Sequence, residues 1–286
     1  MNAFELTTPR SRAETLGLLA NYGAEARLLA GGTGLINLLK LGMARPARLL
    51  SLHALRDMSD IAVDSATLHI GALDRLLDIE RNVEVRAHWP VLGMALRELA
   101  SPRVRSMATL GGAVAHGDPN QDLPAVLIAL DAVLEVAELH GQREVPLGGF
   151  YKDYYETALA PTELICGVRL PRAAPGSRAV FLKFAPRSAE DYATVSVCCR
   201  LDRDIGTGRV LAARVVMGGV GATILRSTAA EAELTGAVPD AAVIASAAAI
   251  AARATDPLTD TRGTAAYKRA MAEVFVRRAL TQLLEP

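Results

Sequence analysis

Two glycine-rich segments, each placed between a predicted strand and a predicted helix, constrain this chain more than any other feature. The first is Ala30-Gly31-Gly32-Thr33-Gly34, which follows a predicted strand at residues 27–30 and precedes a predicted helix at residues 35–41. The second, Thr109-Leu110-Gly111-Gly112, leads into an apolar helix predicted at residues 123–130. Glycine accepts backbone angles that other residues avoid, so we expect a sharp turn at both places. The pattern predicts an α+β fold with two strand, turn and helix units.

The remaining periodicity divides the chain at a linker. Ala173 to Ser177 gathers proline and glycine where the hydrophobic pattern stops, which is typical of a domain boundary. Before it, Ser11 and Glu14 form a capping box that predicts a helix. Further elements are expected there as strands at 48–51, 61–63, 67–71, 133–139, 143–147 and 163–170, and as a helix at 88–100. Beyond the linker we expect antiparallel strands at 179–184, 192–201 and 209–219, then helices at 227–234, 240–254 and 264–284.

Charge and hydropathy exclude several classes of function. The chain has 31 basic and 31 acidic side chains, so it offers no general field for nucleic acid or for an acidic membrane. Its longest uncharged apolar runs, 215–225 and 241–252, fall short of the ~20 residues of a membrane-spanning helix. Residues 1–12 carry charges and no apolar core, unlike a secretory signal. We therefore expect a cytoplasmic protein without membrane insertion.

Metal-based redox chemistry has no sequence signature in this chain. The three cysteines, Cys166, Cys198 and Cys199, form no CxxC pair, and adjacent strand residues point to opposite faces. The five histidines lack the i, i+4 spacing of a helical zinc site. Any redox reaction would therefore need an organic cofactor.

The glycine segments suit a diphosphate, because successive backbone N–H groups can meet its negative charge and glycine lets it approach closely. The dinucleotide fingerprint fails, since Asn37 stands where the third glycine belongs, and no Gly-Lys-Ser/Thr exists for a P-loop. The alternative is that each segment is only a tight turn between strand and helix.

Other polar residues near the segments have a functional and a structural interpretation. Asp118 and Asp122 have the chemistry to accept hydrogen bonds from ribityl or ribose hydroxyls, but Asp122 also suits a helix N-cap. Lys183 and Tyr192 suit the surroundings of a planar heterocycle, or ordinary surface and core. His116 has no paired carboxylate or nucleophile at a readable spacing, so the pattern argues against a catalytic role.

Taken together, these motifs resemble the medium, FAD-binding subunit of molybdenum hydroxylases, the family of the carbon monoxide dehydrogenase medium chain and the xanthine dehydrogenase flavin domain. The resemblance rests on residues 29–35, on residues 109–112, on Gly117-Asp118-Pro119 with Asp122, and on residues 190–194, in the same order and spacing. It covers nearly the whole chain. Two glycine segments followed by two aspartates are far more specific than one glycine motif.

The resemblance implies a two-part FAD-binding domain of the vanillyl-alcohol oxidase type at residues 1–175, with subdomains at about 1–57 and 58–175. A carboxy-terminal flavoprotein domain, a small antiparallel sheet with helices, would occupy residues 176–286. The implied FAD-binding residues are Ala30, Gly31, Gly32, Thr33, Gly34, Leu35, Thr109, Gly111, Gly112, Ala113, Asp118, Asp122, Ile165, Lys183 and Tyr192. The first segment would hold the diphosphate, while Ile165, Lys183 and Tyr192 would approach the flavin ring.

The implied function is electron transfer within a complex. A large subunit would carry molybdopterin, a small subunit would carry 2Fe-2S clusters, and FAD on this chain would pass electrons to an external acceptor. The expected assembly is a dimer of heterotrimers, with no catalytic acid, base or nucleophile on this chain. Carbon monoxide dehydrogenase has His-Ser where this chain has Thr33-Gly34, and many relatives have Asn in place of Ala113, which puts carbon monoxide oxidation in doubt.

Two other functions compete with this interpretation. One is a self-contained FAD-dependent reductase or oxidase of the same fold, which would oxidise NAD(P)H without partners. The other is a scaffold subunit that binds no flavin, in which the glycine segments are only turns.

Overall fold

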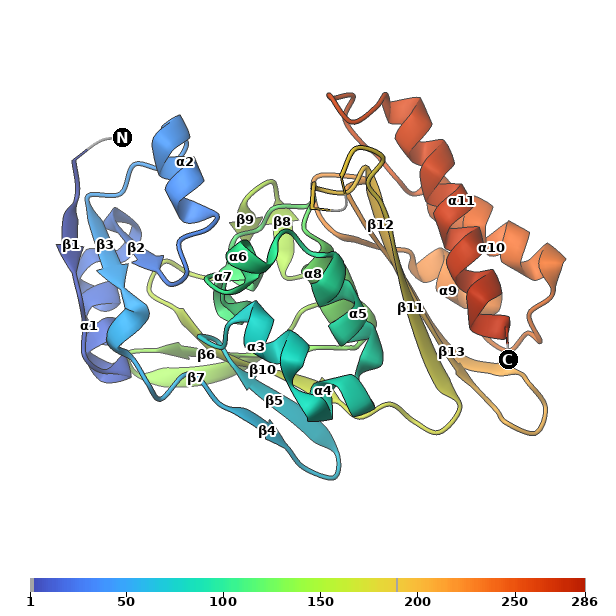
Figure 1. Ribbon diagram of the computed structural model, residues 1–286, viewed down its shortest axis with the longest axis horizontal. Coiled ribbons are helices and arrows are strands. Elements are labelled where there is room, and N and C mark those ends of the chain that lie inside the picture. Colours follow the sequence, from blue (N-terminus) through green and yellow to red (C-terminus); the bar gives the residue numbers. More distant parts are fainter. Residues whose placement is uncertain (1–2, 189, 286) are drawn as a thin grey trace.

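The computed structural model describes residues 3–188 and 190–285, whose helices and strands form three groups that follow one another along the molecule (Figure 1). The first group is a parallel three-stranded sheet in the order β1-β3-β2 with two helices. Its elements are β1 Glu5–Thr7, α1 Arg12–Tyr22, η1 Gly23–Glu25, β2 Ala26–Leu29, α2 Leu35–Leu41, β3 Arg48–Ser51 and η2 Leu52–Ala54. The predicted N-cap is confirmed, because the Ser11 hydroxyl accepts from the Glu14 N–H at 3.1 Å, whereas the Glu14 carboxylate accepts from the Arg10 N–H at 2.7 Å rather than from that of Ser11.

The second group is an antiparallel five-stranded sheet in the order β4-β5-β10-β6-β7, with helices α3 to α8 on one side (Figure 1). Its strands are β4 Ile61–Val63, β5 Thr67–Gly71, β6 Val133–Glu138, β7 Gly141–Pro146 and β10 Leu164–Pro171, with the small pair β8 Tyr151–Asp153 and β9 Glu156–Thr157 beside them. Its helices are α3 Leu76–Arg81, α4 Val83–His88, α5 Pro90–Glu98, α6 Pro102–Arg105, α7 Leu110–Ala115 and α8 Asp122–Ala129.

The helix predicted at residues 88–100 is present as α5, but it begins only at Pro90 and ends at Glu98. The chain forms two helices that meet at Trp89, whose backbone leaves the helical region at φ −130° and ψ 55°. Pro90 explains the break, because its ring restricts the residue before it and removes one N–H, and proline suits the first position of a new helix. The Trp89 side chain is buried and donates to the Pro171 carbonyl at 3.0 Å.

The third group is an antiparallel sheet in the order β11-β12-β13-β14, covered on its outer face by three helices (Figure 1). Its elements are β11 Ser177–Phe184, β12 Val195–Arg203, β13 Val210–Gly218, β14 Leu225–Arg226, α9 Thr228–Leu234, α10 Ala241–Arg253 and α11 Ala265–Leu284. The strand predicted from Tyr192 begins only at Val195, so Tyr192 lies in the preceding loop. Ser177, expected in the linker, already pairs with Asp202 in the sheet.

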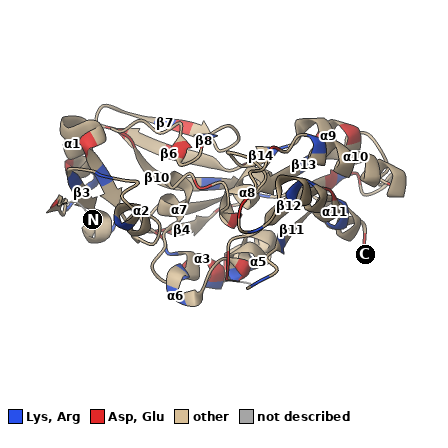
Figure 2. Ribbon diagram, turned by 90° about the horizontal axis from the view of Figure 1, so that it is seen from above, with Lys and Arg blue, Asp and Glu red and all other residues tan. Residues whose placement is uncertain are grey.

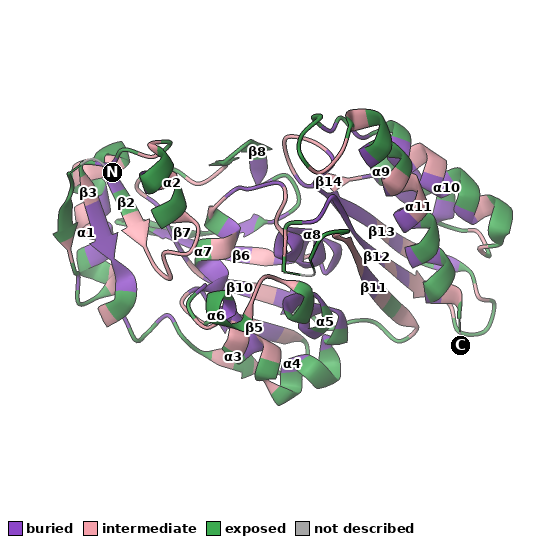
Figure 3. Cartoon of the chain, turned by 45° about the horizontal axis from the view of Figure 1, so that its top comes forward, coloured by how far each residue is buried: buried purple, intermediate pink, exposed green. Residues whose placement is uncertain are grey.

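Helix α8 lies between the second and third groups, and all eight of its residues are buried (Figure 3). Alternate residues of the third sheet serve two cores. Cys198 packs into the core that includes α8, whereas Cys199 packs into the core formed with α10 and α11. The expectation that these two adjacent cysteines face opposite ways is confirmed.

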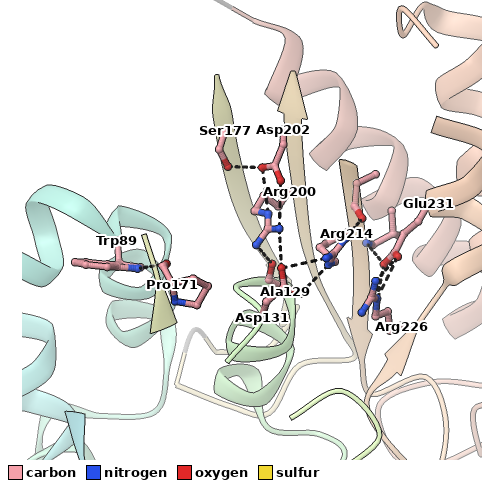
Figure 4. A network of polar contacts seen from close by, with 12 residues as sticks. Trp89, Ala129, Asp131, Pro171, Ser177, Arg200, Asp202, Arg214, Arg226 and Glu231 are labelled. Atoms are coloured by element: carbon pink, nitrogen blue, oxygen red, sulfur yellow. Dashed lines mark hydrogen bonds and ion pairs between the residues drawn. The ribbon is translucent and has the colours of Figure 1, made fainter. Parts of the chain in front are cut away.

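A charged cluster joins the carboxyl end of α8 to the third sheet (Figure 4). Arg200 and Arg214 are direct partners across strands β12 and β13, where two like charges would repel. Asp131, in the left-handed region at φ 55°, accepts from Arg214 Nε at 2.8 Å and from Arg200 Nη2 at 2.7 Å. One carboxylate from the second group therefore offsets two cations of the third, which couples the two groups.

Figure 2 shows acidic and basic residues intermixed over the chain, in keeping with the equal numbers of each. Among residues 3–188 and 190–285, no helix combines the length and the hydrophobicity needed to cross a bilayer.

Candidate functional site

The two glycine segments, residues 30–35 and residues 109–113, lie against each other. A Cβ atom on Gly31 would stand 1.9 Å from the Met107 carbonyl oxygen, so this position has no room for a side chain. A Cβ on Gly112 would lie 3.8 Å from the Ala30 Cβ. The sequence predicts two remote segments that serve one site, and the structure brings them into contact at this point.

The first glycine segment presents backbone donors. Gly32 has φ 73°, a conformation that glycine adopts without strain. Within the described part of the chain, no acceptor is found for the N–H groups of Gly32, Thr33, Gly34 and Leu35. All of residues 30–35 are half-buried, so a ligand has access to these donors. Helix α2 that follows is only seven residues long, so the N–H groups rather than its dipole supply the attraction for an anion.

The second glycine segment is helical, so its prediction as a turn is wrong. Thr109 is the N-cap of α7, and its hydroxyl accepts from the Gly112 N–H at 3.3 Å. The N–H of Gly111 donates to the Ala72 carbonyl at 2.8 Å, and a Cβ on Gly111 would stand 2.7 Å from the Ala72 Cβ. Close packing therefore requires glycine at position 111, while Gly112 is exposed and Ala113 is half-buried.

Asp118 is almost fully buried, at 5% exposure, and holds the loop that leaves α7. Its carboxylate accepts from the Asn120 N–H at 2.9 Å and from Asn120 Nδ2 at 3.0 Å. The Tyr155 hydroxyl lies 3.5 Å from the other carboxylate oxygen. This carboxylate therefore already has protein partners, so a cofactor hydroxyl would have to share it with them.

Asp122 and Lys183 form a buried ion pair, with Nζ 2.8 Å from Oδ2 and side-chain exposures of 5% and 3%. Asp122 is the first residue of α8, and Gln121 is the N-cap, so the alternative that Asp122 caps this helix is wrong. Burial raises the pKa of Asp122 to about 6, against the opposing effect of Lys183. The Asp122 Oδ1 atom is buried and has no hydrogen-bond partner in the described residues. That acceptor suits a hydroxyl group of a bound ligand.

Tyr192 lies in the loop before β12, at 43% exposure, and is approached from two sides. The Arg262 guanidinium carbon lies 5.3 Å from its ring centroid, and the Asp118 carboxylate faces its hydroxyl. Burial, reinforced by the charge of Asp118, raises the pKa of Tyr192. Ile165 is different, because it is buried in β10 opposite Val136 and is 4% exposed. Its approach to a flavin ring stays a prediction.

Three residues near the site, His116, Tyr155 and Arg262, were not predicted from the sequence to belong to it. The His116 ring lies against Gly34, and the Tyr155 ring packs on His116 at a centroid distance of 5.3 Å. Arg262 reaches Tyr192 from the loop before α11. The sequence could have indicated His116, because it lies three residues after Ala113 of the second glycine segment. Tyr155 and Arg262 come from segments that carry no motif.

Comparisons with known proteins agree over the whole chain. Residues 2–173 match the FAD binding domain in molybdopterin dehydrogenase, and residues 180–283 match the CO dehydrogenase flavoprotein C-terminal domain. The chain is 34% identical over 277 residues to the carbon monoxide dehydrogenase medium chain of Hydrogenophaga pseudoflava, covering 97% of this chain and 96% of that one. It is 32% identical to the 6-hydroxypseudooxynicotine dehydrogenase complex subunit alpha of Paenarthrobacter nicotinovorans, over 99% of this chain and 95% of the relative.

Solved structures give the same result. Carbon monoxide dehydrogenase from Hydrogenophaga pseudoflava, lacking the Mo-pyranopterin moiety, superimposes with a TM-score of 0.94 at 36% identity, covering 98% of this chain and 96% of that one. Quinoline 2-oxidoreductase from Pseudomonas putida 86 superimposes with a TM-score of 0.90 at 29% identity, covering 99% and 97%.

Proposed function

Since the chain belongs to the family of medium, FAD-binding subunits of molybdenum hydroxylases, we propose that it relays electrons from 2Fe-2S clusters of a partner subunit, through FAD, to an external acceptor. The observation that carries this proposal is the contact between the two glycine segments, together with the four N–H groups of the first segment that find no acceptor among the residues described. FAD supplies the exchange between one-electron and two-electron carriers, while the protein supplies position and electrostatics.

The residues present fit this cofactor. The N–H groups of Gly32 to Leu35 would hold the diphosphate, with Ala30 packed against the second segment and Gly31 against the backbone just before it. From the second segment, Thr109 and Gly111 would fix the backbone, and Gly112 and Ala113 would face the first segment.

Further along the chain, Oδ1 of Asp122, which has no hydrogen-bond partner in the described residues, would accept from a ribityl hydroxyl. Asp118 would share its carboxylate between its protein partners and another cofactor hydroxyl. Tyr192, Lys183 and Ile165 would surround the flavin ring. The proposal assigns no catalytic acid, base or nucleophile to this chain. It places the FAD-binding domain at residues 1–175 and the carboxy-terminal domain at residues 176–286.

The proposed assembly is a dimer of heterotrimers with a molybdopterin-binding large subunit and an iron–sulfur small subunit. The family relationship supports it, since relatives include the medium chain of carbon monoxide dehydrogenase and a subunit of a dehydrogenase complex. A cytoplasmic location is also proposed, in keeping with three free cysteines in the described part of the chain.

The test is co-expression with the two partner subunits, followed by measurement of flavin per folded chain from its visible absorption. We expect near-stoichiometric flavin in the parent protein. Gly32→Val should lose flavin while the fold is retained, because a branched Cβ is strained at φ 73° and would press on the Ile36 and Leu29 side chains, which displaces the N–H groups of this segment. Gly149→Val, at a loop position with φ 88° and nothing within 4 Å of its Cβ, is the matched control.

Three outcomes would contradict the proposal. Normal flavin content in Gly32→Val would argue against the diphosphate site. Turnover of NAD(P)H by the isolated chain with a small acceptor would favour the self-contained reductase. A parent complex without flavin would favour the scaffold subunit.

A further inference from the structure

His116 lies directly against the first glycine segment. A Cβ atom on Gly34 would stand 2.8 Å from both Cε1 and Nε2 of the imidazole, so the tip of the ring rests on the Gly34 backbone. Gly34 belongs to the run of four N–H groups that have no acceptor in the described part of the chain. The titratable imidazole of His116 therefore lies next to the backbone N–H donors of the first glycine segment.

The surroundings of His116 hold the ring in position and leave its nitrogens available. The Tyr155 ring packs edge-on against it, and the Tyr155 N–H is anchored to the Gly117 carbonyl at 2.9 Å. Within residues 3–188 and 190–285, neither imidazole nitrogen has a hydrogen-bond partner. The charged group that faces the ring is Asp118, while Tyr155 is the neighbouring titratable side chain. His116 is half-buried, so it has access to a ligand.

We propose that His116 is a ligand of the FAD diphosphate, which adds a titratable positive charge to a site otherwise made of backbone donors. This inference rests on the proposed function. The side chains nearest to the glycines of the two segments are Leu29, Ala30, Ile36, Ala72, Thr109 and His116. Of these, only His116 can carry a positive charge, and a diphosphate carries negative charge at neutral pH.

Linkage sets the sign of the expected pH effect. Burial lowers the pKa of His116 in the free protein, although the charge of Asp118 opposes it. A diphosphate within reach favours the charged imidazole and raises the pKa in the complex. Protonation and FAD binding then support each other, so the affinity for FAD falls as the pH rises through the interval between the two pKa values. The fall amounts to about tenfold for each pH unit in that interval.

The experiment measures the dissociation constants of FAD and of riboflavin for the flavin-free full-length chain, by equilibrium dialysis between about pH 5 and pH 8. Riboflavin lacks the diphosphate. We expect the FAD constant of the parent protein to rise about tenfold or more with pH and the riboflavin constant to stay level. His116→Gln keeps a hydrogen-bonding side chain without a titratable charge, so its FAD constant should not change with pH. His140→Gln, in the exposed turn between β6 and β7, is the matched control and should behave like the parent.

Gly34→Ser tests the same contact without altering the imidazole. Gly34 has φ −91°, which serine adopts without strain, but the new Cβ would displace the ring. We expect this variant to lose the pH dependence as His116→Gln does. A nuclear magnetic resonance titration should also show that the pKa of His116 rises when FAD is added to the parent protein.

Two results would overturn this inference: the same pH dependence of the FAD dissociation constant in the parent and in His116→Gln, or a pKa of His116 that does not change when FAD binds. If Gly32→Val still loses FAD in that case, the proposed function itself stands. A parent chain that binds no FAD at any pH would overturn the proposed function as well.

Discussion

Asp131→Asn is the sharpest test of how the third sheet is joined to the rest of the chain. The substitution keeps the size and one oxygen of the side chain but removes its charge. Arg200 and Arg214 would then face each other across β12 and β13 without the carboxylate that lies between them (Figure 4). Their side chains are only 12% and 21% exposed, so water can replace the lost partner only in part.

The expected cost follows from the contacts. Asp131 accepts three charge-assisted hydrogen bonds, at 2.8 and 3.1 Å from Arg214 and at 2.7 Å from Arg200. Removing one partner of a fully buried pair costs about 3–5 kcal/mol. Asparagine retains one acceptor and the cluster is partly hydrated, so we expect the free energy of unfolding to fall by about 2–3 kcal/mol.

The assay is urea unfolding followed by two probes. Trp89 is the only tryptophan of the chain and is buried in the second group, so its fluorescence reports that group, whereas far-ultraviolet circular dichroism reports all three. We expect the dichroism midpoint to fall by roughly 1 M, given a slope of about 3 kcal/mol per M. The two transitions should also separate, because the third sheet loses its coupling to the second group.

Changing the pH gives an independent check. Burial by itself would raise the pKa of Asp131, but the hydrogen bonds from Arg214 and the charge of Arg200 outweigh it and lower that pKa. The stabilisation is therefore present above the ordinary pKa of an aspartate and is lost as the pH falls through the lowered value. The difference between parent and variant should shrink in acid. Asp57→Asn, at an exposed position, is the control, and a midpoint shift no larger than that of this control would refute the reasoning.

Two further predictions concern the candidate site. Because burial raises the pKa of Asp122 to about 6, the folded protein binds the extra proton between about pH 4 and pH 6, and its free energy of unfolding should decrease as the pH rises through that range. Asp122→Asn should remove this component, as seen by urea unfolding at several pH values, and an unchanged slope would contradict it. Tyr192→Ala should change the rate at which oxygen reoxidises the reduced flavin more than it changes the dissociation constant of FAD. Stopped-flow absorption measures that rate, and identical rates in parent and variant would argue against packing of Tyr192 on the ring.

Local patterns predicted most elements, because the forces that start and stop them act within a few residues. Ser11 caps α1, and the predicted strand at Arg48–Ser51 is confirmed at both ends. The errors also have local causes that were underrated. Pro90 sets a later start for the helix predicted from residue 88, and the cap at Thr109 makes a helix of the second glycine segment. In the first case the proline ring outweighed the hydrophobic periodicity, and in the second the threonine cap outweighed the tendency of glycine to form a turn.

The candidate site was predictable only in part. The first glycine segment was predicted as a diphosphate site because glycine allows a close approach and positive φ, and that role stays a prediction. The roles of Asp122 and Lys183 were left open, because their pairing joins α8 to a strand about sixty residues away and no periodicity reports such a contact. Tyr155 and Arg262 were missed for the same reason.

By itself, the order of residues determined the α+β composition and the presence of two glycine segments that suit a diphosphate. Only the tertiary structure decided that these segments touch, that His116 rests on Gly34 and that one carboxylate serves two arginines. The physical reason is the distance along the chain over which each interaction acts. Capping, turns and periodicity act between near neighbours in the chain, whereas close packing and charge pairing depend on distance in space, which folding alone sets.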